Sequence, residues 1–255
     1  AGIDVHAVDR AASHTHAPIV YVDPAAHHPT GAVLSRLRAE SLLAVARRRD
    51  AVVVEDLSQA GLTLSPGGPG HADAVRPLAA ADGSVIAIGS LSRTFWAGLR
   101  IGWLRAPAPL RGYLLRLRGA ADLGPAVPSQ IIAARLLAAA DTGWYHDLRR
   151  ALRERRDLLL DGLERHLPAW KRHVPPAGLA MWTTLPVAET DTFAHLAGNR
   201  FGVLVTAGTA LCFDGRHRDG LRLSFAESPA TLGTAVDRLA VAWEEHSRRL
   251  ASGVV

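Results

Sequence analysis

Residues 89–103 decide the fold, and they read Gly-Ser-Leu-Ser-Arg-Thr-Phe-Trp-Ala-Gly-Leu-Arg-Ile-Gly-Trp. A short apolar run at residues 85–88 precedes this stretch, and a second apolar run occupies residues 101–104. Such runs beside a polar loop are typical of buried strands. The loop carries serine hydroxyl groups at Ser90 and Ser92 and guanidinium groups at Arg93 and Arg100. Because hydroxyls and fork-shaped guanidinium groups match phosphate oxygens, the loop is a plausible phosphate site.

The stretch resembles the cofactor loop of fold-type-I pyridoxal-phosphate aminotransferases, most closely the aminotransferase-type domain of the MocR subgroup of GntR regulators. The family pattern is Ser-x-Ser-Lys followed by Gly-Leu-Arg-x-Gly-Trp, and its lysine forms a Schiff base with the cofactor. The resemblance implies that Ser90 and Arg100 bind the cofactor phosphate. Ser92 fits either a cofactor contact or a simple turn hydroxyl.

Arg93 stands at the position of the Schiff-base lysine. That chemistry needs a neutral primary amine, which lysine supplies when its pKa is lowered. An arginine side chain stays protonated in proteins and cannot attack an aldehyde. The chain has one lysine, Lys171, in a segment at residues 170–173 that is expected to form a surface turn.

Asp56 follows an apolar run at residues 51–54 that is expected to be a buried strand. Ligands bind at the carboxyl ends of strands in doubly wound sheets, although an aspartate there also caps ordinary turns. The resemblance implies that Asp56 pairs with the pyridine nitrogen of the cofactor. It also places Ser58 where the regulators usually have a tyrosine that reaches the ring hydroxyl. His28 stands at the asparagine position of an Asn-Pro-Thr-Gly turn, where a ring nitrogen could replace the amide.

Composition excludes several functional classes. The 255 residues are 48% apolar and 21% charged, which is typical of a globular protein, and no apolar run approaches the length of a membrane helix. The net charge of +5 comes from arginines interspersed with acids, so a solvated helix face explains it better than a nucleic-acid site. The adjacent His27 and His28 lack a third ligand, and we expect no metal. The chain has one cysteine, Cys212, which excludes an internal disulfide and makes a cytoplasmic location the default expectation. We expect its thiol to be buried and structural.

The chain opens with an alternating pattern at residues 3–8 that predicts a strand. Compared with the family, the usual glycine-rich phosphate turn and the residue that stacks on the cofactor would lie before residue 1, and no winged-helix segment is expected. Ser35 is predicted to cap a helix whose inward side includes Leu37, Leu42, Val45 and Ala46. The segment at residues 66–70 is predicted to be a flexible loop and not a nucleotide-binding turn.

The second half alternates between helical and strand patterns. Helices are predicted there from about residues 129 and 144, near residues 191–198, and after Ser228; strands are predicted at residues 179–183, 202–205 and 220–225. In the first half, a further strand is predicted at residues 18–22. Arg222 lies in the last strand, where an exposed strand arginine is the ordinary interpretation. The resemblance to an Arg-Leu-Ser-Phe signature implies instead that Arg222 binds a substrate carboxylate.

The predicted fold class is α/β, with an aminotransferase-like, mostly parallel sheet that lacks its N-terminal part and a smaller C-terminal α/β domain. The expected organisation is a partial cofactor-binding domain at residues 1–107, connecting helices at 108–168 and the small domain at 169–255. Two functions remain open. One is a domain that binds pyridoxal 5'-phosphate but is catalytically impaired, and senses an amino acid or another carboxylate. The other is an active aminotransferase in which Arg93 is an introduced substitution or another chain supplies the lysine. The resemblance also implies a homodimer.

Overall fold

The computed structural model describes residues 2–64, 76–122, 124, 126–212 and 214–252. The predicted loop at residues 66–70 therefore lies outside the described part. The chain divides into two compact units. Unit 1 comprises residues 1–28, 32–147 and 176–178, and unit 2 comprises residues 29–31, 148–175 and 179–255. None of the described helices is long and apolar enough to cross a membrane.

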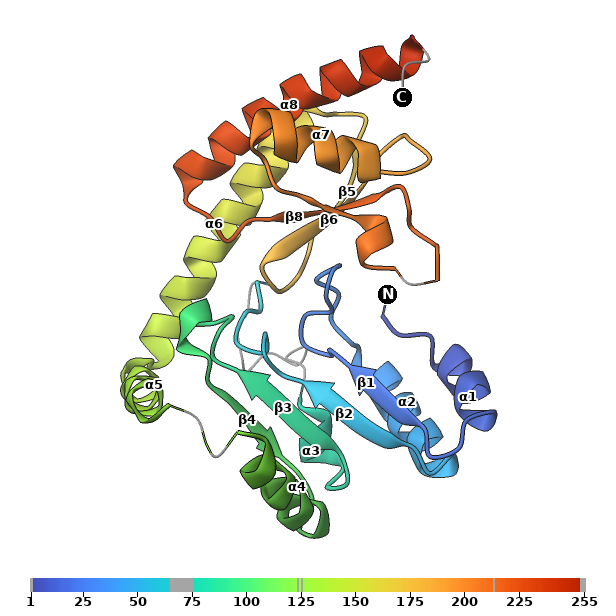
Figure 1. Ribbon diagram of the computed structural model, residues 1–255, viewed down its shortest axis with the longest axis vertical. Coiled ribbons are helices and arrows are strands. Elements are labelled where there is room, and N and C mark those ends of the chain that lie inside the picture. Colours follow the sequence, from blue (N-terminus) through green and yellow to red (C-terminus); the bar gives the residue numbers. More distant parts are fainter. Residues whose placement is uncertain (1, 65–75, 123, 125, 213, 253–255) are drawn as a thin grey trace. The chain divides into compact units, whose positions relative to one another are not determined.

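Unit 1 is built on a four-stranded sheet of order β1-β2-β3-β4 (Figure 1). Its strands are β1 (Ile19–Val22), β2 (Val52–Asp56), β3 (Ile86–Ser90) and β4 (Gly102–Arg105). The first three run parallel, with Val22 beside Glu55 and Asp56 beside Ile88, and β4 runs antiparallel to β3. The mostly parallel sheet confirms the predicted fold class. Its three parallel strands deliver their carboxyl ends to one edge.

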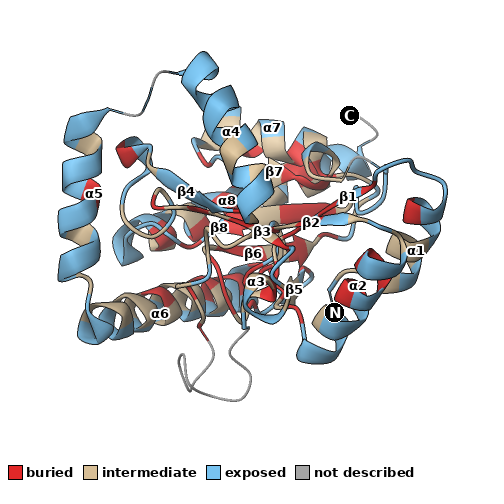
Figure 2. Ribbon diagram, turned by 90° about the horizontal axis from the view of Figure 1, so that it is seen from below, coloured by how far each residue is buried: buried red, intermediate tan, exposed pale blue. Residues whose placement is uncertain are grey.

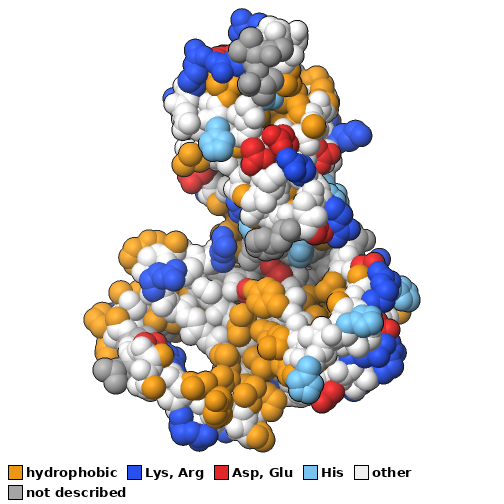
Figure 3. Space-filling view, turned by 45° about the vertical axis from the view of Figure 1, so that its right-hand side comes forward, with side chains coloured by type: hydrophobic (Ala, Val, Ile, Leu, Met, Phe, Trp, Pro, Cys, Tyr) orange, Lys and Arg blue, Asp and Glu red, His pale blue; other side chains and the backbone are white. Residues whose placement is uncertain are grey.

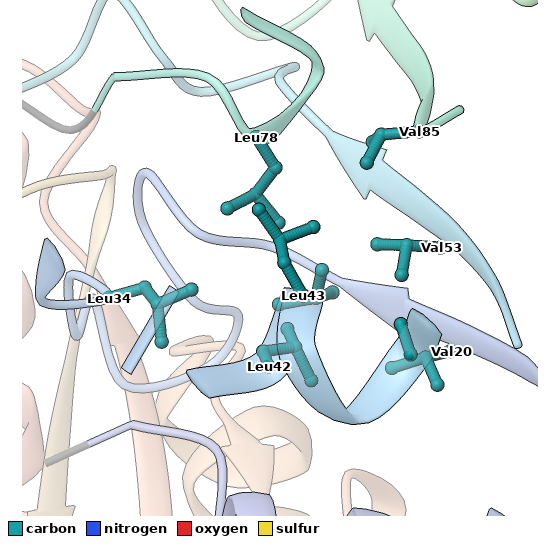
Figure 4. Close-up of a cluster of buried hydrophobic side chains, with 9 residues drawn as sticks. Val20, Leu34, Leu42, Leu43, Val53, Leu78 and Val85 are labelled. Carbon is teal, nitrogen blue, oxygen red and sulfur yellow. The ribbon is translucent and has the colours of Figure 1, made fainter. Parts of the chain in front are cut away.

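One face of this sheet packs on helices α2 (Arg36–Arg48) and α3 (Leu78–Ala81). Ser35 caps α2 as predicted, because its hydroxyl accepts a hydrogen bond from the amide of Arg38. The inward side of α2 differs from the prediction at Leu37, which is 76% exposed. Figure 4 shows the resulting cluster, whose buried members are Val20, Val22, Leu34, Leu42, Leu43, Ala46, Val53, Leu78 and Val85.

The opposite face of the sheet, which we call the open face, is covered only in part by the residues that the structure describes. Strand β1 alternates exposed and buried residues, so that Ile19 is 70% exposed while Val20 is buried. Every residue of β4 is exposed, which contradicts the prediction of a buried strand at residues 101–104. Helix α4 (Ala108–Ala121) has no buried residue, and helix α5 (Val127–Ala139) has one, Ala133 (Figure 2). Trp96 and Trp103 are exposed as well, so neither is a core aromatic.

The N-terminal segment is a helix, α1 (Val5–Ser13), and the strand predicted at residues 3–8 is wrong. The carboxylate of Asp4 accepts hydrogen bonds from the amides of His6 and Ala7, which caps the first turn. Val5, Val8 and Ala12 are spaced as on one helix face, and the two valines pack on the core of unit 1. The cap and this longer period outweigh the short alternation that suggested a strand.

Unit 2 has an antiparallel sheet of order β5-β6-β8-β7, formed by β5 (Lys171–His173), β6 (Ala180–Thr184), β7 (Thr206–Ala207) and β8 (Gly220–Ser224). Its helices are α6 (Thr142–His166), which enters the unit at Leu148, α7 (Asp191–Phe201) and α8 (Pro229–Ala251). Ser228 caps α8 as predicted.

Two local predictions in unit 2 are wrong. Lys171 does not lie in a surface turn but begins strand β5, directly after the buried Trp170. The strand predicted at residues 202–205 is absent, because Gly202 adopts a left-handed conformation that ends α7, and pairing begins only at Thr206.

Candidate functional site

The carboxyl edge of the unit 1 sheet gathers polar side chains at the ends of β1, β2 and β3. Asp56 ends β2, and its Oδ1 accepts a hydrogen bond from the amide of Ser58 at 2.7 Å. Its Oδ2 accepts a hydrogen bond from the Tyr21 hydroxyl at 2.5 Å. Ser58 therefore contributes its backbone amide to the site. Sequence reasoning missed Tyr21, the last residue but one of β1; it is paired with Val54, which lies on the same sheet face as Asp56.

Asp23 is a second carboxyl group at this edge, and it follows β1 directly. The pKa of Asp23 is raised to about 6: burial is the main cause and the negative charge of Asp56 adds to it, whereas hydrogen bonds from Ala26, His28 and Gln59 oppose the shift. The amide of Ala26 donates to Oδ1 of Asp23 at 3.4 Å. A carboxyl group with a raised pKa beside a second carboxylate is typical of functional sites.

Gln59 and His28 flank the two acids. The side-chain amide of Gln59 donates to the carbonyl of Ala26 at 3.0 Å, which connects the loop after β2 to the loop after β1. His28, expected near the cofactor, is exposed in the loop after β1. Nothing in the sequence singled out Asp23 or Gln59, because each is an ordinary loop residue until the parallel register places the two strand ends side by side.

The phosphate-binding candidates lie in the loop between β3 and β4. Ser90 ends β3, and its Oγ accepts a hydrogen bond from the amide of Ser92 at 3.2 Å, so the Ser90 hydroxyl proton can still be donated to a ligand. Arg100 has φ of 53°, in the left-handed region, after the short 3₁₀ turn η1 (Ala97–Leu99). Arg93 and Arg100 are both exposed.

Arg222, the candidate carboxylate ligand, lies in unit 2. It is half-buried at the centre of β8, where it pairs in register with Trp182 of β6 and Thr206 of β7. It is therefore not the exposed strand arginine of the ordinary interpretation. Cys212 is half-buried in the same unit, and burial raises the pKa of its thiol, which makes it a poor nucleophile. In the described ranges, no group of three His, Cys, Asp or Glu side chains could hold a metal ion.

Within unit 1, the edge combines two kinds of chemistry. Asp56 offers a carboxylate to a hydrogen-bond donor or a cation, and its neighbours fix its orientation. Ser90, at the end of the adjacent strand, and the arginines of the following loop offer donors to an anion. Ligands of doubly wound sheets bind outside the carboxyl ends of such strands. The arrangement suits a small molecule that carries both an anionic group and a hydrogen-bond donor or cation.

Residues 1–239 match the family model for aminotransferase class I and II. The chain belongs to this family. Among solved structures, α-aminoadipate aminotransferase LysN from Thermus thermophilus aligns with a TM-score of 0.86 and 24% identity, over 96% of this chain and 63% of that one. An archaeal alanine:glyoxylate aminotransferase aligns with a TM-score of 0.85 and 27% identity, over 96% of this chain and 62% of that one.

Curated relatives include transcriptional regulators. An uncharacterized HTH-type transcriptional regulator, YisV of Bacillus subtilis (strain 168), is 32% identical over 247 residues, which are 92% of this chain and 47% of that protein. The chain thus spans about half the length of the curated relatives that it matches. The similarity agrees with the resemblance noted from residues 89–103.

Proposed function

We propose that this aminotransferase-like domain binds pyridoxal 5'-phosphate without a covalent bond and serves as a ligand-sensing rather than a catalytic domain. The solved LysN structure contains N-(5'-phosphopyridoxyl)-L-leucine, a cofactor adduct with an amino acid. The carboxyl edge of unit 1 has polar groups that complement such a cofactor. A carboxylate ends β2, and a hydroxyl ends β3 and opens a loop with two exposed arginines.

The proposal gives each residue one task. Asp56 pairs with the ring N–H, which keeps the ring positively charged and able to withdraw electrons. Ser90, Ser92 and Arg100 hold the phosphate, and His28 contacts the ring hydroxyl. Arg222 binds the carboxylate of an amino acid or a related small molecule through its two-pronged guanidinium. The exposed apolar side chains of α4 and α5 support a homodimer.

One observation supports the absence of covalent catalysis. The position expected for lysine carries Arg93, whose guanidinium stays protonated and cannot add to an aldehyde. The single lysine, Lys171, begins strand β5 of unit 2 and does not belong to the loop after β3. The relationship to an HTH-type regulator supports a sensing role, in which ligand binding changes the state of a longer protein.

Borohydride reduction in the presence of pyridoxal 5'-phosphate, followed by peptide mass spectrometry, tests the proposal. The wild-type chain should show a saturable change in cofactor absorbance but no added cofactor mass. Arg93→Lys should gain one cofactor mass on residue 93, because the new amine enters a site that already holds the aldehyde.

Arg111→Lys is the matched control, since Arg111 is an exposed arginine on α4 outside the site. It should gain no mass under conditions that label residue 93. Specific labelling of Lys171 in the wild-type chain, together with turnover of an amino acid, would instead support an active aminotransferase. No cofactor binding by either the wild-type chain or Arg93→Lys would refute the proposed function.

A further inference from the structure

The hydrogen bond from Tyr21 to Asp56 crosses between two neighbouring strands. Tyr21 is paired in register with Val54, and Asp56 lies two residues further along β2 on the same face of the sheet. The phenol therefore reaches diagonally to the end of the next strand, where its hydroxyl lies 2.5 Å from Oδ2 of Asp56. Its ring is 58% exposed on the open face of the sheet, so the residue contributes little to the core.

The two hydrogen bonds on Asp56 end on different oxygens. Oδ1 is held by the Ser58 amide at 2.7 Å, and Oδ2 is held by Tyr21. A carboxylate bound at one oxygen can still turn about its terminal torsion, whose preferences are broad. A carboxylate held at both oxygens has one orientation. Each oxygen also keeps a second acceptor position, so both bonds are compatible with a further donor from a ligand.

Tyr21 acts as the donor in this pair. Burial of its hydroxyl and the adjacent charge of Asp56 raise the pKa of Tyr21 above its ordinary value, so the phenol stays protonated. The phenol hydroxyl therefore donates a charge-assisted hydrogen bond to the Asp56 carboxylate. A carboxylate is also the acceptor that a protonated ring nitrogen needs.

We propose that Tyr21 is a positioning residue, which orients the Asp56 carboxylate so that this carboxylate can pair with the ring nitrogen of pyridoxal phosphate. The inference rests on the proposed function and adds a residue to it. Tyr21 acts through Asp56 and does not itself touch the ring nitrogen. Its contribution should therefore disappear when either Asp56 or the ring nitrogen is removed.

The test compares two ligands by equilibrium dialysis. One is pyridoxal 5'-phosphate, and the other is its 1-deaza analogue, in which carbon replaces the ring nitrogen. Tyr21→Phe should weaken binding of pyridoxal phosphate by about 5- to 10-fold, the effect of losing one hydrogen bond that supports a charge. Its affinity for the deaza analogue should stay within about twofold of the wild-type value, because that ligand does not pair with Asp56.

Tyr113→Phe provides the matched control, because Tyr113 is an exposed tyrosine on α4, and it should alter neither affinity. In an Asp56→Asn background, Tyr21→Phe should cause no further loss for either ligand. Equal weakening of both ligands, or an unchanged affinity for pyridoxal phosphate, would overturn the role of Tyr21 and leave the proposed function standing. A wild-type chain that binds neither ligand would overturn both.

Discussion

The two units of the chain bury their apolar side chains to different extents. Unit 2 packs Trp170, Phe193, Trp243 and His246 into an aromatic cluster, and both Trp170 and Phe193 are fully buried there. In the described part of unit 1, the main apolar cluster packs on one face of the sheet, and most of the large exposed apolar residues of the described chain lie in this unit (Figure 3). Unit 2 is organised around its own interior, whereas unit 1 leaves one face available for contacts.

This difference has a physical consequence for stability. Parallel strands are normally covered on both faces, and an exposed apolar face contributes nothing to folding until something covers it. The candidate ligand site lies at the edge of the open sheet, beside the exposed ring of Tyr21. We therefore expect the stability of unit 1 to depend more strongly on a bound ligand or partner than the stability of unit 2 does. The substitutions below test the contrast between the two units.

The largest effect is expected in the aromatic cluster of unit 2. Phe193→Ala removes a fully buried ring that contacts Trp170 and Trp243 edge-on, and it should lower the free energy of unfolding of unit 2 by about 3–5 kcal/mol. Trp96→Ala, at a site that is 62% exposed in unit 1, should cost less than about 0.5 kcal/mol.

Native-state hydrogen exchange read by mass spectrometry measures both variants, because peptides from the two units report separately. Phe193→Ala should speed exchange in β6, β8 and α7 and leave β1 to β3 near their wild-type rates. Equally faster exchange in both units would show that they unfold as one body and would remove the contrast.

A smaller effect is expected at Glu55, the buried acid of unit 1. Its carboxylate accepts hydrogen bonds from the amides of Leu78 and Ala79, at 2.8 and 2.7 Å, and so caps the first turn of α3. Glu55→Ala leaves those amides without their acceptor and should cost about 2–4 kcal/mol in unit 1. Glu40→Ala removes an exposed acid on α2 and should stay within about 0.5 kcal/mol of wild type when both variants are unfolded in urea. A Glu55→Ala cost as small as that of Glu40→Ala would show that α3 does not need this cap.

The contrast also explains which predictions from sequence succeeded. The strands of unit 1 could be predicted because β-branched runs such as residues 51–54 have few other interpretations, although only Val53 of that run is buried. The strand predicted at residues 3–8 was wrong because the side chain of Asp4 caps a helix, and a cap outweighs a short alternation. The predicted burial of Leu37 was wrong because a single apolar residue can lie outside the buried stripe of its helix.

The candidate site was only partly visible in the sequence. Asp56, Ser90 and Arg100 stand in motifs that can be recognised along the chain. Whether Tyr21 and Asp23 belong to the site depends on which residue of β1 lies beside which residue of β2, and a single sequence does not give that register. Residues that act through a neighbouring strand are therefore the ones that require a structure.

The smallest expected effect is an opposite response of the two units to acid. The pKa of His246 is lowered by burial and by the charge of Arg249, so the folded state favours the neutral ring. Stability from this residue is present above the ordinary histidine pKa of about 6.5 and is lost as the pH falls below it. Unit 2 should therefore lose stability on mild acidification.

The contribution of Asp23 to stability changes with pH in the opposite direction to that of His246. Its pKa is raised from 3.8 to about 6, so the folded state favours the protonated carboxyl, and stability from Asp23 is lost as the pH rises through about 6. Protonation of Asp23 should stabilise unit 1 as the pH falls from about 6 toward 4, a range in which Asp9, with a pKa of about 2, stays ionised. Burial lowers the pKa of His27 in the same unit, so His27 opposes this gain below about pH 6.5.

Hydrogen exchange at several pH values, corrected for intrinsic exchange rates, separates the two responses by unit. Asp23→Asn should flatten the response of unit 1 and leave that of unit 2 unchanged, while His246→Gln should do the reverse. Because each group titrates inside a different unit, a variant that flattens both responses would contradict their independence. A unit 1 response that persists in Asp23→Asn would assign it to another acid at the carboxyl edge, and the raised pKa of Asp23 would then not control the site.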